Sequence, residues 1–369
     1  MNRNPIFSLA ALLASIFLAL PVTMLADDSA ASIAAGGLVA RRETRVVMAK
    51  EVLRISPAKV IVDYDFRNDT DEDVTTEVAF PIPPYTEGPD ESPASMTSFS
   101  DFQVRVGGKA IPVQAEAKAF VNGREVTEIL VADKIDIASF GHHDWNSNRI
   151  PDFTRLPSAE RKRLAKLGIF DPTLPMGVWT VHLQYHWTQT FPAHSTVQIR
   201  HEYTPYEGFE FMQHDAIRNA LHEPLLDKKS EENSGWSEDV KLLASFCPDA
   251  PFLRGVEHSI QTAPPHAGDY AYPHWVDFIL TSANTWKQPI EDFTLIVERG
   301  RPVDGYGKPI ENEQNLISFC SPQNVPVEKL DADRFQVHLT NFVPKSELRI
   351  GFFDIVTTGR KTGSSPSKK

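Results

Sequence analysis

The chain has 369 residues, of which 41% are hydrophobic and 23% are charged, and this composition excludes a protein that is disordered throughout. The length predicts about two domains, each large enough to bury a core. The formal net charge of −12 argues against nucleic acid as a partner, because binding to nucleic acid depends on Lys and Arg side chains that neutralise phosphates.

Residues 1–26 have the features of an export signal. Arg3 supplies a positive charge near the start, and the apolar run at 6–20 is shorter than the roughly 20 residues that span a membrane. Pro21 follows, and cleavage after Ala26 fits the pattern. We therefore expect a periplasmic or secreted protein with no membrane span after cleavage. An uncleaved N-terminal anchor is the alternative.

Hydrophobic residues alternate with polar ones from Arg45 to Pro83, which predicts two strands. The six polar residues NDTDED, at 68–73, separate these strands and predict a hairpin. A Pro-, Ser- and acid-rich loop follows. The segment 102–120 alternates again around a Gly-Gly turn at 107–108 and predicts a second hairpin.

The acidic run between the first two strands also matches part of a calcium loop. Asp69, Asp71 and Asp73 have the spacing of the first three ligands of an EF-hand. The positions that need Gly and a bidentate acid hold Val74 and Phe80 instead. We expect a solvated turn at the hairpin tip, with weak calcium binding as the alternative.

Residues 124–170 predict a helical insertion, with Ser158 as a candidate N-cap. Its loop contains His142, His143 and Asp144, which could supply a general base with its orienting acid. The chain has no G-x-S-x-G nucleophile elbow, so an ordinary polar loop is the simpler interpretation. Next, the segments 179–188 and 195–203 alternate with period two and predict an antiparallel strand pair with one face on a core.

The rest of the chain predicts a helical bridge at 207–268, further strands at 269–357 and a flexible tail at 358–369. The predicted fold class is mainly β with helical insertions. It consists of two β-sandwich-like antiparallel domains, at 27–206 and 269–357, joined by the helical segment. Cys247 and Cys320 are the only cysteines, and an exported chain favours a disulfide between them over two buried thiols.

Three segments resemble a known family: RISPAKVIVDYDFRNDTDEDVTTEVAFPIPP, WTVHLQYHWTQTFPAHSTVQIRHEYTPYEG and WVDFILTSANTWKQPIEDFTLIVERG. With the signal segment and the AGGL motif at 35–38, they are similar to the bacterial family called domain of unknown function 4424. The resemblance covers nearly all of the chain after residue 26. It implies an exported bacterial protein of unassigned function and brings no catalytic residues with it.

The predicted function is a non-enzymatic binding or scaffolding protein with no cofactor, whose partner is an envelope protein or polymer. Aromatic residues in loops, such as Tyr85, Trp145 and Trp236, are candidates for the partner surface. One alternative is a secreted hydrolase that uses the loop at 142–144. The other is an envelope-carbohydrate binder that uses the aromatic sheet face of Trp179, Tyr185 and Trp187, a face that packing in a core explains better. The sequence gives no indication of oligomeric state.

Overall fold

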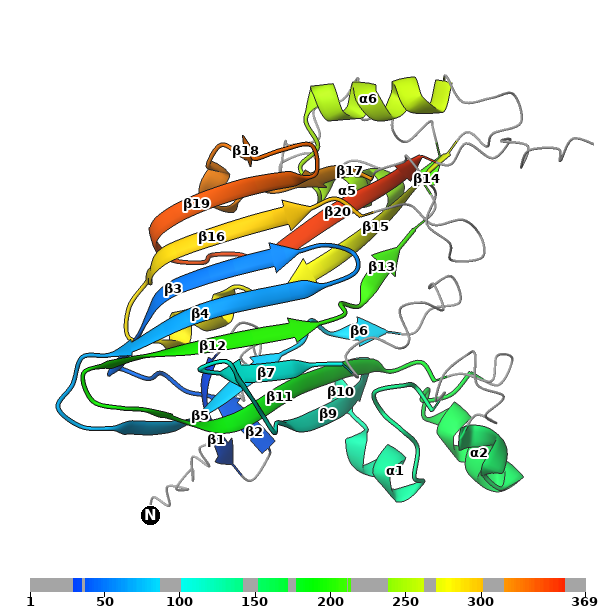
Figure 1. The fold of residues 1–369 in the computed structure, drawn as a ribbon. Coiled ribbons are helices and arrows are strands. Elements are labelled where there is room, and N and C mark those ends of the chain that lie inside the picture. Colours follow the sequence, from blue (N-terminus) through cyan, green and yellow to red (C-terminus); the bar gives the residue numbers. More distant parts are fainter. Residues whose placement is uncertain are drawn as a thin grey trace, which may run out of the picture.

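A computed structural model describes residues 29–34, 37–86, 101–141, 152–171, 177–210, 212–213, 238–261, 270–300 and 315–355. Over these residues the chain is mainly β, as predicted, and its strands form three sheets (Figure 1). The predicted signal segment at 1–26, the loop at 142–151 and the tail at 358–369 lie outside the described residues.

The largest sheet in the described part of the chain has eight strands. Their order is β18 (Glu328–Lys329), β19 (Arg334–Phe342), β16 (Ile290–Glu298), β3 (Val46–Ile55), β4 (Val60–Asn68), β12 (Ser195–Tyr203), β7 (Gln103–Val106) and β8 (Lys109–Ile111). β7 and β8 form the predicted hairpin around Gly107 and Gly108, whose positive φ angles of 55° and 80° suit glycine. All neighbours pair antiparallel except β3 and β16, which are parallel.

A second sheet, of seven strands within the described residues, lies below the first in Figure 1. It contains β10 (Arg124–Glu125), β9 (Gln114–Val121), β11 (Thr180–Phe191), β5 (Val74–Pro81), β1 (Ser29–Ala34) and β2 (Gly37–Ala40), with β6 (Tyr85–Thr86) beside β11.

The third sheet lies behind the upper strands of the first. As far as the structure describes it, it contains β13 (Glu207–Phe209), β15 (Tyr270–Phe278), β20 (Leu348–Ile355) and β17 (Leu316–Phe319), with β14 (Met212–Gln213) beside β15.

The predicted hairpin around NDTDED is wrong. β4 pairs with β12 in the first sheet, whereas the next strand, β5, pairs with β11 in the second. β11 and β12 are likewise consecutive strands in different sheets, so the pair predicted at 179–203 is also wrong. Together the four strands form one long antiparallel ribbon that bends from one sheet into the other. The acidic run at 68–73 is therefore a corner between sheets.

The structure does not show two separate sandwiches. β16 and β19, from the predicted second domain, join β3 and β4 in the eight-stranded sheet. β13 and β14, from the predicted helical bridge, are strands of the third sheet. One hydrophobic core lies between the three sheets and includes Phe66, Phe80, Phe293 and Phe352. Each sheet thus contributes side chains to a shared core, and this burial stabilises all three together.

Short helices flank the sheets and contribute side chains such as Leu130 and Leu164 to this core. The region of the predicted insertion contains α1 (Thr127–Ala132), the 3₁₀ turn η2 (Asp152–Arg155) and α2 (Ser158–Lys166). α2 ends before Gly168, which has a φ of 73°, and Pro157, not the predicted Ser158, occupies its N-cap position. Two further 3₁₀ turns are η3 (Thr281–Thr285) and η4 (Pro322–Asn324).

Two helices cover the outer face of the third sheet: α5 (Glu238–Ala244) and α6 (Ala250–Gln261). A small second core, which includes Phe246, Val256 and Phe353, lies beneath them. The predicted disulfide between Cys247 and Cys320 is present and joins the end of α5 to the end of β17, with its Cα atoms 4.9 Å apart. None of the described helices is both long and apolar enough to cross a membrane.

Candidate functional site

A pocket of about 210 Å³ lies where the edges of the sheets meet. Its lining comes from β6, from the end of β12 and the loop after it, and from β13, β15 and β20. The lining residues are Pro83, Pro84, Tyr85, Thr86, Tyr203, Pro205, Tyr206, Gly208, Trp275, Asp277 and Arg349. Because these segments lie far apart in the sequence, the pocket exists only in the folded chain.

Two tyrosines form one wall of the pocket, and hydrogen bonds hold both. The hydroxyl of Tyr85 donates to the carbonyl oxygen of Ala138 at 2.8 Å, and that of Tyr206 donates to the carbonyl oxygen of Thr86 at 2.8 Å. Their ring centroids are 5.0 Å apart. Burial raises the pKa of Tyr85 above its ordinary value, so its phenol stays protonated and remains a donor.

Trp275 also lines the pocket. Its indole lies against Gly208, where an added Cβ would be 2.0 Å from the ring, so only glycine permits this contact. The guanidinium of Arg349 lies 5.4 Å from the indole centroid, a distance that allows a cation–π interaction. Arg349 also donates to both carboxylate oxygens of Asp277, at 2.7 and 2.9 Å. These hydrogen bonds raise the pKa of Arg349 above its ordinary value.

The arrangement is a preformed pocket that is lined by aromatic rings and has one charged pair at its side. Rings that are already held in place lose little conformational entropy when a ligand binds, which favours affinity. The volume is smaller than the roughly 300–1,000 Å³ of sites that enclose a whole small molecule. The pocket therefore suits one side chain or one ring of a larger partner.

The three aspartates of the acidic run lie at the corner between β4 and β5, and each has a described partner there. Asp69 accepts from Arg67 Nε at 2.9 Å, and Asp71 pairs with His194 at 2.9 Å. Asp73 accepts from the backbone N–H of Ala193 at 2.9 Å. The contacts of Asp71 and Asp73 hold the corner between β4 and β5 against the one between β11 and β12.

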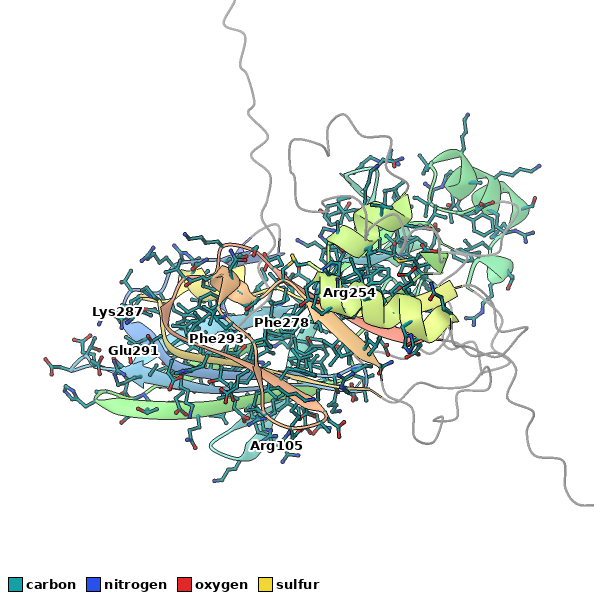
Figure 2. The ribbon with its side chains drawn as sticks, turned by 90° about the horizontal axis from the view of Figure 1, so that it is seen from above. Arg105, Arg254, Phe278, Lys287, Glu291 and Phe293 are labelled. Atoms are coloured by element: carbon teal, nitrogen blue, oxygen red, sulfur yellow. A yellow bond between two sulfur atoms is a disulfide. The ribbon has the colours of Figure 1, made fainter. Side chains whose placement is uncertain are left out.

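The same corner is tied from within by Asn68, whose side-chain amide donates to the carbonyl oxygen of Phe191 at 2.9 Å. Glu291 and Lys287 lie at this end of the molecule in Figure 2, and Glu291 accepts two hydrogen bonds from Arg67 at 2.8 Å. The described residues include no group of three His, Cys, Asp or Glu side chains that could hold a metal ion. Weak calcium binding at Asp69, Asp71 and Asp73 stays a prediction.

The other predicted site residues are divided between the core, the pocket and the undescribed segments. Trp179 and Trp187 are buried in the core, and the ring of Tyr185 stacks on that of Phe102 with the centroids 4.0 Å apart. The aromatic face of β11 that these three residues form therefore packs inward. Tyr85 lines the pocket, although it is only 6% exposed. His142, His143, Asp144, Trp145 and Trp236 lie outside the described residues.

A cluster of titratable side chains lies on the third sheet. Two of its members, Glu207 and His274, directly precede the pocket residues Gly208 and Trp275 in the sequence. His274 Nε2 is 2.7 Å from Asp354, and its Nδ1 is 3.5 Å from Glu207. Burial raises the pKa of Glu207 to about 7. For His274, burial alone would lower the pKa, but the hydrogen bond and charge of Asp354 and the charge of Glu207 raise it overall.

Sequence reasoning missed most of the pocket. Alternation along 270–278 predicts that Trp275 and Asp277 share a face, but it does not reveal what covers that face. Gly208 lies 67 residues before Trp275 in the sequence, and Arg349 lies 74 residues after it. The pairing of β15 with β13 and β20 brings them together.

The model of the family described as domain of unknown function (DUF4424) matches residues 26–350. Among solved structures, the chain is similar to a "putative nutrient binding protein" from Legionella pneumophila, with 13% identity and a TM-score of 0.35. That match covers 89% of this chain and 70% of the other. None of the curated proteins matches. Because this family model matches most of the chain, the chain belongs to the DUF4424 family.

Proposed function

We propose that this protein is an exported, periplasmic or secreted binding protein without enzymatic activity, and that its aromatic pocket binds a segment of an envelope protein. The observation that carries the proposal is the preformed pocket of Tyr85, Tyr206 and Trp275. Its volume suits a single side chain of a larger partner. The Cys247–Cys320 disulfide supports export, because such bonds persist in oxidising compartments.

The pocket also lies beside a strand that can accept another. β13 is an end strand of the third sheet as the structure describes it, and Gly208 at its centre lines the pocket. Extended peptides can add to the end strand of a sheet, and pockets beside such a strand select alternate side chains. A peptide that lies along β13 would place one side chain between Trp275 and Tyr206.

A photo-crosslinking amino acid at Thr86 tests the proposal in the native host. Thr86 is an exposed residue of the pocket lining, so a bound partner would lie within reach of it. The matched control is the same amino acid at Leu330, which is 40% exposed and lies next to β18, outside the pocket lining. We expect one recurrent envelope-protein adduct from Thr86 and none of that adduct from Leu330. Identical adducts from both positions would contradict the proposal.

A second candidate function is binding of an envelope carbohydrate. The observation that favours it is the Arg349–Asp277 pair beside the indole of Trp275, because sugars present both an apolar face and hydroxyls. Glycan fragments should then quench tryptophan fluorescence in the native protein but not in a Trp275→Phe variant. Equal quenching in the two proteins would place the effect at another tryptophan.

A further inference from the structure

The outer face of the eight-stranded sheet carries a second hollow, of about 400 Å³. Four basic side chains line it: Lys50 and Arg54 on β3, Arg200 on β12 and Arg105 on β7. The acidic side chains in the lining are Asp63 and Asp65 on β4. In Figure 2, Arg105 lies at the periphery, away from the core residues Phe278 and Phe293. The hollow therefore faces solvent and not the core.

Two of these arginines face each other directly. Arg105 and Arg200 are cross-strand partners in the pairing of β7 with β12. Directly opposite residues have their Cβ atoms roughly 5 Å apart, and two like charges in that position destabilise a sheet. An arrangement that is unfavourable in the free protein becomes favourable when an anion lies between the two guanidinium groups.

The neighbouring carboxylate compensates this pair only in part. Asp63 receives a hydrogen bond from Arg54 at 2.7 Å, while Arg200 lies 3.4 Å from its other oxygen. Among the described residues Arg105 forms no ion pair, and its guanidinium donates to the amide oxygen of Gln103 at 3.5 Å. Its guanidinium donors are thus available to a ligand.

We propose that this hollow binds a phosphate group between Arg105 and Arg200. Four basic and two acidic side chains leave a local excess of two positive charges in a chain whose net charge is −12. A phosphate monoester carries about −1.5 to −2 at neutral pH and so matches this excess. The guanidinium fork donates two parallel hydrogen bonds to phosphate oxygens, which adds geometric selectivity to the charge.

The phosphate could be free or carried on a lipid headgroup, and two probes distinguish these sources. Inorganic phosphate is titrated by calorimetry, and flotation is measured with vesicles of phosphatidylcholine that contain or lack phosphatidic acid. The variant is Arg105→Gln/Arg200→Gln. The control is Arg161→Gln, which removes a positive charge from an exposed position on α2.

We expect the native protein to bind inorganic phosphate, or to bind vesicles only when they contain phosphatidic acid. In either case the double variant should bind at least tenfold more weakly and the control variant should bind normally. Should the double variant not fold, Arg105→Gln alone serves the same comparison. The proposal is overturned if the native protein binds neither probe, if the variant binds as tightly as the native protein, or if Arg161→Gln weakens binding equally.

Discussion

The core contains a histidine that makes folding sensitive to acid. His201 is fully buried and is surrounded by aromatic rings, with centroids 5.4 Å away for Tyr64, 5.0 Å for Phe80, 5.6 Å for Phe102 and 5.2 Å for Trp187. Burial lowers its pKa to about 3, compared with an ordinary value of 6.5. The folded protein therefore holds this imidazole neutral down to acidic pH.

The direction in which stability changes with pH follows from the protons that the folded and unfolded chains bind. Between about pH 6.5 and pH 3, the unfolded chain binds a proton at His201 that the folded chain does not, so stability is lost as the pH falls. Each pH unit in this window costs about 1.4 kcal/mol. From pH 7 to pH 4.5 this residue alone should lower the free energy of unfolding by about 2.5 kcal/mol.

A His201→Phe variant removes this titration and keeps an aromatic ring at the site. Urea unfolding of both proteins at pH 7 and at pH 4.5 gives the two losses of stability. The variant should lose about 2.5 kcal/mol less than the native protein, whatever its stability at pH 7. A His338→Gln control, at an exposed histidine on β19, should lose as much as the native protein. Equal losses in the native protein and in His201→Phe would refute the reasoning.

Three further predictions concern stability and the pocket. Replacing Cys247 and Cys320 with Ser opens a loop of 73 residues and should lower the free energy of unfolding in urea by about 4 kcal/mol; a loss below about 1 kcal/mol would contradict the entropic argument. Glu207→Gln should stabilise the protein by about 3 kcal/mol at pH 8. The raised pKa of this carboxyl favours folding below pH 4.5, and that contribution is lost as the pH rises through about 7. Urea unfolding should therefore show little difference at pH 4.5, and equal stability at pH 8 would count against a buried Glu207. Gly208→Ala should displace the indole of Trp275, which shifts tryptophan fluorescence and costs about 1–3 kcal/mol; an unchanged spectrum would show that the indole does not lie on Gly208.

Local patterns in the sequence predict the strands well. β4 alternates between buried and partly exposed residues along its whole length, as the period of two requires. The Gly-Gly turn between β7 and β8 was also predictable, because few other residues adopt two successive positive φ angles. The disulfide was predictable because an exported chain with two cysteines favours their pairing.

The pairing of strands was not predictable in the same way. A strand followed by six polar residues and another strand has the same local pattern whether the chain forms a hairpin or turns a corner between sheets. The difference lies in contacts with β11 and β12, more than 100 residues away. The parallel pairing of β3 with β16 likewise depends on a shared core and leaves no local signal.

The candidate pocket was not predictable from the sequence for the same reason. Tyr85 could be selected as an aromatic residue in a Pro-rich stretch, but its partners Tyr206 and Trp275 lie on other elements. The long-range pairings that define the sheets also define the pocket, so the sequence reveals the pocket residues only one at a time.

The most direct test of binding at the pocket is the yield of the Thr86 photo-adduct when Tyr206 is replaced with Ala. Tyr206 is partly exposed in the pocket lining and is not one of the aromatic residues that surround His201. The variant should therefore fold with a similar melting temperature. We expect the recurrent adduct to fall at least tenfold in the variant. An adduct of the same identity and the same yield would show that the partner binds without the pocket and would contradict the account.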